Sequence, residues 1–307
     1  MEHNKNVFGH VIAFLTIFIW GTTYISTKVL LKDFQPIEIL IFRFVLGFIV
    51  LIMVYPHKLK LTNRKQEFIF AAAGLCGVTL YYLLEIVALS YTMASNVGVI
   101  IVIAPFFTAI FAHFFLKGEQ LRARFFIGFI VAMLGIILIT FNGATTFKIN
   151  PFGDFLAILA AVAWAAYSIL TRKISDYGYH TVATTRHIFF YGLLFMLPSL
   201  FLYDFKLKIE RFYNLTNLLN LLFLGLAASA LCFVTWNFAV KILGAIKTSV
   251  YIYLTPVITV VTASIILNEK ITVVSFLGTM LTLSGLLISE SKFKLFKQKE
   301  EIISLKS

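Results

Sequence analysis

Residues 251–270 read YIYLTPVITVVTASIILNEK, a stretch that is apolar almost throughout except for a proline near its start and a charged pair at its end. Residues 99–119, VIIVIAPFFTAIFAHFFLKGE, follow the same plan. Proline removes one helical hydrogen bond and clashes with the preceding turn, at a cost of about 3 kcal/mol. Membrane helices nevertheless tolerate proline where neighbouring groups satisfy the freed carbonyl. We therefore expect two membrane helices that bend at Pro105 and Pro256, and these bends are either gating elements or fixed features of the packing.

The composition of the whole chain indicates a membrane protein. Its 307 residues are 60% hydrophobic and only 13% charged, with a mean hydropathy of +0.93, whereas about a quarter of the residues in soluble domains are charged. A membrane helix needs about 20 apolar residues. Ten runs of about this length predict an all-α polytopic membrane protein with ten transmembrane helices, at residues 10–30, 36–55, 66–89, 94–116, 123–141, 152–172, 182–203, 217–240, 247–267 and 272–289.

The net charge of +12 is better explained by membrane topology than by binding to nucleic acid. A nucleic-acid interface needs its basic residues on one folded surface, and here they are spread between the apolar runs, so we expect no nucleic-acid partner. If the N-terminus is cytoplasmic, most lysines and arginines between the runs fall on the cytoplasmic side. The positive-inside rule then predicts a multi-pass protein of the cell (inner) membrane with both termini in the cytoplasm, and residues 291–307 form a basic cytoplasmic tail.

An internal repeat divides the chain into two halves. Pro256 lies 151 residues after Pro105, and the same offset aligns further positions, such as Gly74 with Gly225 and Thr108 with Thr259. With one residue removed, Gly128 and Gly135 align with Gly278 and Gly285. We expect two five-helix repeats, at residues 8–141 and 152–290. Because five is an odd number, the second repeat must cross the membrane in the opposite sense. Inverted repeats of this kind are typical of carriers that work by alternating access, with the substrate site near the midplane.

The order of several residues in each half also resembles a known family. In the first half these residues are Trp20, Gly21, Tyr24, Arg43, Pro105 and Glu119, and in the second half they are Trp164, Arg186, Pro256 and Glu269. Over about residues 8 to 290 the chain resembles the EamA-type transporters of the drug/metabolite transporter superfamily. One departure is Ala165, which stands where the first half has Gly21.

The resemblance implies a ten-helix carrier, often an exporter of amino acids or other small metabolites. It also implies a central cavity lined by helices one, three and four and by their counterparts in the second half, helices six, eight and nine.

Two charged residues within the apolar runs are the first candidates for the mechanism, because ionisable groups at membrane depth are rare and functional by default. At 1.5 Å per residue, Arg43 and Glu85 lie at a similar depth, so the two side chains can meet as an arginine–carboxylate pair between the second and third helices. The pair is either structural or functional. In the functional case, Glu85 exchanges its arginine partner for a substrate ammonium group or a proton. The second half retains Arg186, a further candidate for ion pairing or coupling, and has Trp236 at the position of Glu85.

Aromatic residues form a second set of candidates. Trp20 and Tyr24 are spaced by four residues, as are Tyr81 and Glu85, so each pair shares one face of its helix. Rings that line a pocket suit an apolar or aromatic substrate and can stack on a cation. The alternative is that they form the aromatic belts of the membrane interface. The predicted substrate-binding set is Trp20, Tyr24, Tyr81, Glu85, Trp164, Tyr167, Trp236 and Tyr251.

The sequence contains no phosphate-binding GxxxxGK[ST], no dinucleotide-binding GxGxxG and no HExxH, so we expect neither a cofactor nor a metal. We predict a secondary active transporter, not an enzyme, that moves a small organic metabolite such as an amino acid or a similar amphipathic solute, with export as the expected direction. Its partners are this substrate and the lipid bilayer, and a homodimer is possible. Two alternatives stay open: a membrane-embedded enzyme acting on a lipid-linked substrate, and a passive solute channel.

Overall fold

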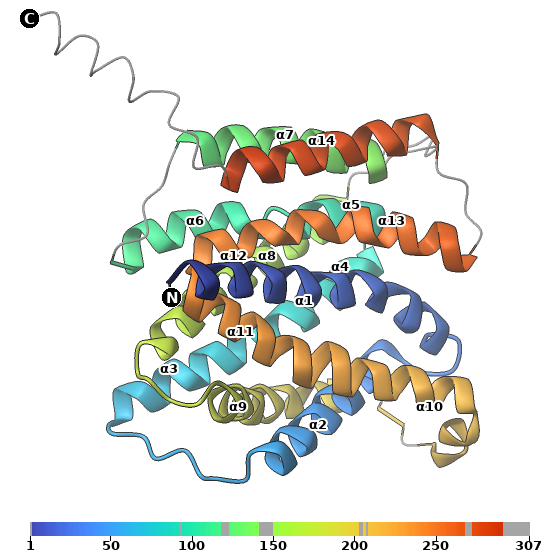
Figure 1. Cartoon of the computed structure of the whole chain (residues 1–307). Helices are drawn as coiled ribbons and strands as arrows, with labels where there is room; N and C mark the ends of the chain where they lie inside the picture. Colours follow the sequence, from blue (N-terminus) through green and yellow to red (C-terminus); the bar gives the residue numbers. More distant parts are fainter. Residues whose placement is uncertain are drawn as a thin grey trace, which may run out of the picture.

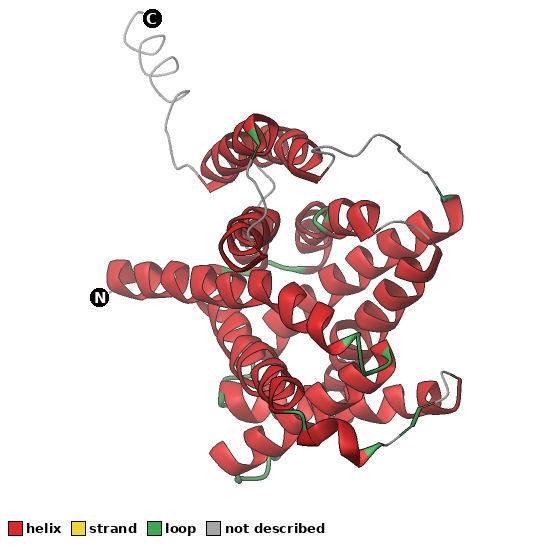
Figure 2. Cartoon of the chain, turned by 90° about the vertical axis from the view of Figure 1, so that its right-hand side faces the viewer, coloured by secondary structure: helices red, strands yellow, loops and turns green. Residues whose placement is uncertain are grey.

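The computed structural model describes residues 2–91, 94–117, 123–140, 150–202, 205–206, 208–267 and 272–290. Within these residues the chain forms helices and no strand (Figure 2). In this described part of the chain, eight helices are long and apolar enough to cross a membrane: Lys5–Thr27, Pro36–Val54, Arg64–Ala88, Val97–Phe115, Pro151–Ser175, Thr181–Leu202, Leu215–Leu243 and Ala245–Thr262. Two shorter apolar helices, Ala123–Ile139 and Val273–Ser289, fall where the remaining two of the ten apolar runs lie. The chain is therefore a polytopic helical membrane protein, and the predicted basic tail lies outside the described residues.

The first part of the chain begins with the long helix α1 and ends with α7. Helix α2 starts at Pro36, which stands at a position where a helix needs no N–H donor. Asn63 is the N-cap residue of helix α3, and its side chain accepts a hydrogen bond from the Gln66 N–H at 2.9 Å. The elements are α1 (Glu2–Leu30), α2 (Pro36–Val54), α3 (Arg64–Gly74), η1 (Leu75–Leu80), α4 (Tyr81–Tyr91), α5 (Ala94–Ile101), α6 (Ala104–Phe115) and α7 (Ala123–Thr140).

The second part repeats this pattern of long and interrupted helices. Helix α8 starts at Pro151 behind Asn150, whose side chain accepts from the Gly153 N–H at 3.1 Å. The elements are α8 (Pro151–Ser175), α9 (Thr181–Leu202), η2 (Ile209–Tyr213), α10 (Leu215–Leu222), η3 (Phe223–Leu231), α11 (Cys232–Leu243), α12 (Ala245–Val250), η4 (Tyr251–Tyr253), α13 (Leu254–Leu267) and α14 (Val273–Glu290).

The two prolines of the opening stretches interrupt their helices, as the sequence predicts. Between α5 and α6 the helix breaks just before Pro105, which lies in the first turn of α6. Pro256 lies in the first turn of α13, directly after the 3₁₀ turn η4. The missing N–H of each proline therefore falls at the start of a new helical segment, where it is best tolerated. Whether these breaks move during function stays a prediction.

Segments η1 and η3 are π-helical insertions that continue into α4 and α11 without a break. π-Helical turns are rare and are frequent at functional sites. Glycines in and next to η1 allow close contacts with the other half of the chain. A Cβ atom on Gly77 would lie 2.2 Å from the ring of Tyr167, and one on Gly74 would lie 2.6 Å from the carbonyl oxygen of Ile188.

Helices α7 and α14 pack side by side and form the top edge of the molecule in Figures 1 and 2. Their backbones approach closely at glycines. A Cβ atom on Gly135 would lie 2.5 Å from the carbonyl oxygen of Gly278, and one on Gly128 would lie 2.5 Å from that of Gly285. The small residues thus serve helix packing within one chain, as is common in membranes. The possible homodimer stays a prediction.

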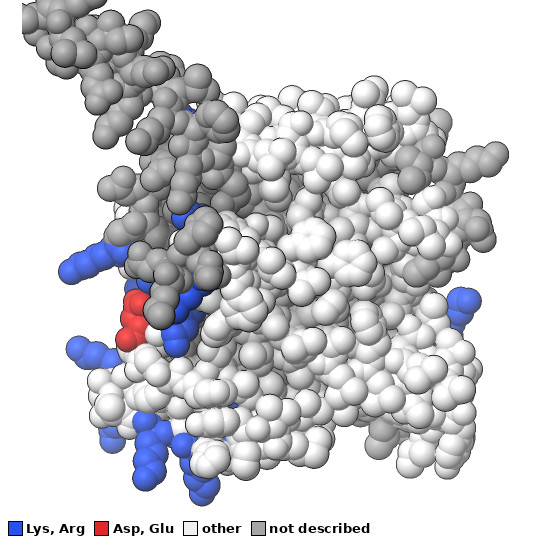
Figure 3. Space-filling view, in the orientation of Figure 1, with Lys and Arg blue, Asp and Glu red and all other residues white. Residues whose placement is uncertain are grey.

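The surface of the described residues has one basic end. Lysine and arginine side chains gather at the left of Figure 3, and most of the remaining visible surface carries no charge. In Figure 1, α1 begins and α14 ends at this same side. Large apolar side chains are exposed along the helices, among them Phe114, Phe201 and Val273. This is the surface expected of helices that face lipid.

Candidate functional site

A cavity of about 310 Å³ lies between α1, α2, α4, α8 and the broken helices around Pro105 and Pro256. It extends from Trp20 and Trp164 to the turn between α1 and α2, where Leu31 is half exposed. Its walls are mostly apolar, with residues such as Ile17, Ile39 and Val102. An apolar pocket with a few polar groups is the usual form of a small-molecule site.

Two tryptophans form the inner end of this cavity. The rings of Trp20 and Trp164 meet edge to face, with centroids 5.4 Å apart. The indole N–H of Trp20 donates to the carbonyl of Ala228 at 2.8 Å. The indole N–H of Trp164 is buried and has no partner among the described residues. This N–H is enclosed by protein, so in this conformation the ring of Trp164, not its N–H, forms the wall of the cavity.

Arg43 and Glu85 both line the cavity, but no ion pair joins them among the contacts of the described residues. The expected direct contact is therefore not made in this conformation. Arg43 is almost completely buried, donates from Nε to the hydroxyl of Ser229 at 2.9 Å and lies over the ring of Tyr82 at 5.2 Å. These partners hold the guanidinium group in place without a carboxylate. The cavity thus offers one basic and one acidic side chain that do not neutralise each other by contact.

The predicted aromatic set divides between the cavity and its surroundings. Trp20, Tyr81 and Trp164 line the cavity, and the rings of Tyr81 and Trp164 lie 5.0 Å apart. Helix α1 carries Tyr24, whose side chain lies outside the described residues.

Tyr167, Trp236 and Tyr251 do not line the cavity. Trp236 is fully buried beneath Trp20, with their ring centroids 5.3 Å apart. The hydroxyl of Tyr167 donates to Asn237 Oδ1 at 2.8 Å. The hydroxyl of Tyr251 contacts Nδ1 of His10, near the start of α1. These three residues are part of the packing between the cavity and the N-terminal end of α1.

Arg186 also lies away from the cavity, near the start of α9. Its guanidinium group donates to the backbone carbonyls of Tyr55 and His57 in the segment after α2. Pro105 and Pro256, the predicted gating residues, lie beside the cavity but do not line it. Their neighbours Ala104 and Thr255 are part of the cavity wall. Glu119 and Glu269 lie outside the described residues.

Among the described residues, four polar residues of the cavity wall are absent from the set predicted from the sequence: Thr23, Thr27, Tyr82 and Thr255. Thr23 and Thr27 follow Trp20 by three and seven residues, which places all three on one helical face. This spacing was a signal that could have found them. Among the described residues, no group of three histidine, cysteine or acidic side chains could hold a metal ion.

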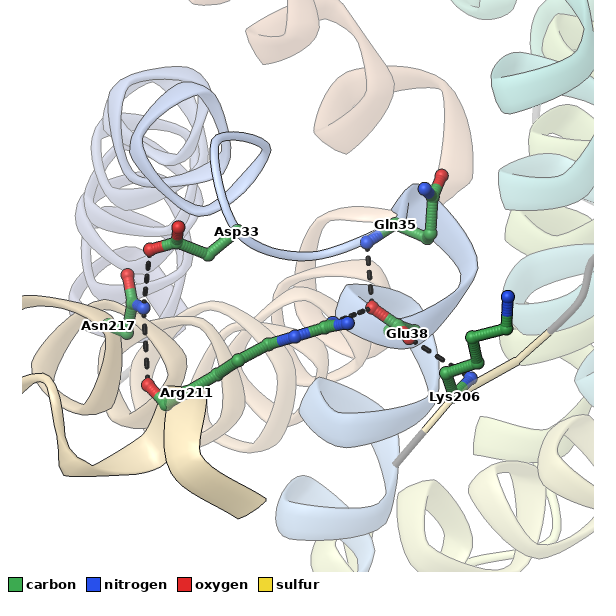
Figure 4. Close-up of polar contacts among 6 residues, drawn as sticks. All are labelled: Asp33, Gln35, Glu38, Lys206, Arg211 and Asn217. Carbon is green, nitrogen blue, oxygen red and sulfur yellow. Dashed lines mark hydrogen bonds and ion pairs between the residues drawn. The ribbon is translucent and has the colours of Figure 1, made fainter. Parts of the chain in front are cut away.

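A cluster of polar contacts joins the start of α2 to residues 206–217, near the mouth of the cavity (Figure 4). The side chain of Glu38 is fully buried and accepts hydrogen bonds from Arg211 Nη1 at 2.6 Å, the Gln35 N–H at 2.7 Å and the Lys206 N–H at 3.1 Å. Asn217 donates to the carboxylate of Asp33 at 2.7 Å. The cluster ties the start of α2, which lines the cavity, to the segment between α9 and α10.

Comparisons with known proteins identify relatives that are similar over most of this chain. A family model described as the EamA-like transporter family matches residues 7–141 and again residues 151–290. An "Uncharacterized transporter" of Archaeoglobus fulgidus is 28% identical, with 92% of this chain and 97% of the relative covered. A "Probable amino-acid metabolite efflux pump" of Escherichia coli is 24% identical, with 91% and 93% covered.

A solved structure titled "Crystal structure of protein" has the same fold. Its TM-score is 0.77 at 19% identity, and the match covers 95% of this chain and 98% of the other. The two family matches together span most of the sequence, on a polytopic helical fold with a central cavity. The chain belongs to the EamA-like transporter family.

Proposed function

We propose that this transporter is a secondary active carrier that moves a small amphipathic metabolite, such as an amino acid, by alternating access. The observation that carries the proposal is the cavity, which has Arg43 on one helix, Glu85 on another and an inner end made of two tryptophans. No enzymatic role is needed to explain these residues, and the names of the relatives indicate transport.

The chemistry of the cavity favours a substrate with two opposite charges and an apolar body. Arg43 lines the cavity and can bind a carboxylate. Glu85 can bind an ammonium group, and the rings of Trp20 and Tyr81 offer apolar surface. The volume is near the lower end of the 300–1,000 Å³ that is usual for ligand pockets. The name of the Escherichia coli relative agrees with an amino acid or a related metabolite.

The pairing of helix contacts supports two inverted five-helix repeats, at residues 8–141 and 152–290, and thus ten transmembrane helices. Helix α1 packs on α11 as α4 packs on α8. Helix α1 packs on α13 as α6 packs on α8, and α2 packs on η3 as α9 packs on η1. The π-helical segments and the proline breaks also occur once in each half. A pseudo-two-fold axis between the halves would relate two conformations, each open to one side.

The distribution of charge supports a cytoplasmic location for the basic end of the molecule, because positive residues favour the cytoplasmic side. Both termini would then be cytoplasmic, and the cavity would open to the outside of the cell membrane. A cavity that holds substrate and opens outward is one of the two states that an exporter requires. Export is the direction we propose.

A passive channel fits the structure less well. Below Trp20 and Trp164 the rings of Trp236 and Phe233 close the path, and both are fully buried. A channel needs a polar pore through this region, and none is found between the described residues there. The carrier is favoured for this reason.

Counterflow in proteoliposomes tests the proposal. Vesicles with purified protein are loaded with one unlabelled amino acid, and the same labelled amino acid is added outside, across a panel of amino acids. A carrier gives transient, saturable accumulation of label against its gradient for at least one of them. Flux that neither saturates nor responds to the internal amino acid would indicate a channel, and no flux for the whole panel would refute an amino-acid carrier.

A further inference from the structure

A second, very small pocket lies near the basic end of the molecule, between α8, α9 and α11. Its volume is about 10 Å³, and its walls include Thr171, Ser175, Thr184, Asn237 and Lys241. This volume is about what one water molecule needs. Its wall is more polar than that of the central cavity, although in this conformation the pocket is too small for any metabolite.

The small pocket occupies the place in the second half that the central cavity occupies in the first. The offset of 144 residues between Trp20 and Trp164 also relates Thr27 to Thr171 and Leu31 to Ser175. The offset of 151 residues relates Ile86 to Asn237. Thr27, Leu31 and Ile86 line the central cavity, and their three counterparts line the small pocket. The small pocket is therefore positioned as the closed equivalent of the open cavity.

A buried hydrogen-bonded triad reaches both spaces, since Asn237 lines the small pocket and Tyr167 packs on Trp164 of the cavity wall. The Tyr167 hydroxyl donates to Asn237 Oδ1 at 2.8 Å, and Asn237 Nδ2 donates to the hydroxyl of Thr185 at 3.0 Å. Tyr167 and Thr185 are fully buried, and Asn237 is 6% exposed. The triad joins α8, α11 and α9, and the ring of Tyr167 lies 5.1 Å from that of Trp164 at the inner end of the cavity.

We propose that the Tyr167–Asn237–Thr185 triad is the inner gate of the carrier, and that breaking it enlarges the small pocket into the inner half of the transport path. The inference rests on the proposed alternating access. Hydrogen bonds suit a gate between two discrete states, because a buried polar group must have a partner. In the closed state the three side chains satisfy one another, and in the open state water or substrate replaces these partners. Lys241 is exposed and lies at the mouth of the opened path.

Thiol labelling of the full-length protein tests the gate. Thr171 is 3% exposed, so Thr171→Cys, in a background with Cys76→Ala and Cys232→Ala, reacts slowly with a membrane-impermeant maleimide. Inside-out vesicles present the basic end to the reagent. Adding Tyr167→Phe, which removes one hydroxyl and keeps the ring, is expected to accelerate labelling several-fold. Thr185→Val removes the other end of the triad and is expected to have the same effect.

Tyr253→Phe is the matched control. Tyr253 is also fully buried, but its hydroxyl has no hydrogen-bond partner among the described residues, so labelling of Thr171→Cys is expected to stay unchanged. Gel filtration identifies any variant that has not folded. If one of Tyr167→Phe and Thr185→Val has not folded, the labelling rate of the other is used for the test.

Unchanged labelling in the folded triad variants would overturn the gate, as would fast labelling of Thr171→Cys alone. Counterflow by the parent protein is measured in parallel. If counterflow persists while labelling does not respond, the gate inference fails and the carrier stands. If the parent protein shows no counterflow, the proposed function fails independently of the labelling.

Discussion

Among single residues, the charged side chains differ most between the two halves of the chain. Arg43 and Arg186 occupy related places in the two halves, yet Arg43 lines the cavity and Arg186 binds the carbonyls of Tyr55 and His57. Glu85 has no acidic counterpart, because Trp236 stands at that position. The two charged side chains of the cavity wall therefore both come from the first half, and isosteric substitutions can test their proposed role.

Replacing Glu85 with Gln is expected to reduce transport about tenfold or more and to weaken its dependence on pH. The loss of one charge-assisted hydrogen bond is worth about 1.5–3 kcal/mol, and 1.4 kcal/mol is about a factor of ten. Initial rates of counterflow at several pH values measure the effect. Glu67→Gln is the control, since Glu67 is partly exposed and pairs with His187 away from the cavity. Unchanged rates with an unchanged pH profile in Glu85→Gln would remove this carboxylate from the mechanism.

Replacing Arg43 with Gln is expected to raise the KM for the transported solute by about tenfold or more, for the same energetic reason. The matched substitution Arg186→Gln removes an arginine that lies outside the cavity, so its KM is expected to stay within about twofold. Concentration-dependent counterflow measures both. Equal KM changes in the two variants would contradict the placement of the substrate beside Arg43.

At the scale of helices, glycines and one buried carboxylate hold the elements together. The contacts of Gly135 with α14 and of Gly77 with Tyr167 leave no room for a side chain. Glu38 satisfies three donors at once where α2 begins. These contacts determine how closely helices from the two parts of the chain approach each other.

Replacing Gly135 with Ala is expected to lower the thermal midpoint of the purified protein by several degrees. The added methyl group would lie 2.5 Å from backbone atoms of Gly278 and Thr282, and backbone cannot move aside as a flexible side chain can. Gly98→Ala is the control, because a Cβ atom at this position would meet no atom within 4 Å besides the adjacent residues and the backbone of its own helix. Alanine favours a helix more than glycine does, so Gly98→Ala is expected to keep or raise the midpoint. A midpoint that falls equally in both variants would contradict the contact with α14 as the cause of the loss.

Neutralising Glu38 is expected to destabilise the protein by about 3 kcal/mol, because the buried charge pair with Arg211 is broken while its other donors remain. The comparison is Asp176→Asn, in which an exposed pair with Arg172 at 3.6 Å is lost. Exposed pairs contribute about 1 kcal/mol or less. Thermal unfolding of Glu38→Gln and Asp176→Asn in the same detergent measures the difference. Equal midpoints would contradict a stabilising role for the cluster at the cavity mouth.

At the scale of the whole molecule, the apolar runs and the doubled motifs were enough to predict a polytopic helical transporter and its family, and both are confirmed. Trp20 and Trp164 were chosen as candidate site residues from the sequence, and both line the cavity. The contacts of Arg43 could not be predicted, because they depend on Ser229 and Tyr82 from distant elements.

The sequence also did not predict which aromatic side chains of the second half point into the cavity. Glu85 follows the π-helical segment η1 as Trp236 follows η3. Glu85 nevertheless lines the cavity, whereas Trp236 packs beneath Trp20. The conformation matters as well, because the cavity is open in one half only, and Tyr167 is a buried gate residue in our proposal although it corresponds to Thr23 in the cavity wall.

In the proposed transport cycle, the two ends of this molecule open in alternation. Spin-label pairs at equivalent places test this by pulsed distance measurements in lipid: Leu31 with Tyr91 at the end where the cavity opens, and Ser175 with Ile242 at the basic end. Alternating access gives two populations whose distances change in opposite directions, the first pair closing as the second opens, with their ratio shifted by a transported amino acid. A single fixed distance for each pair, or two distances that lengthen together, would contradict it.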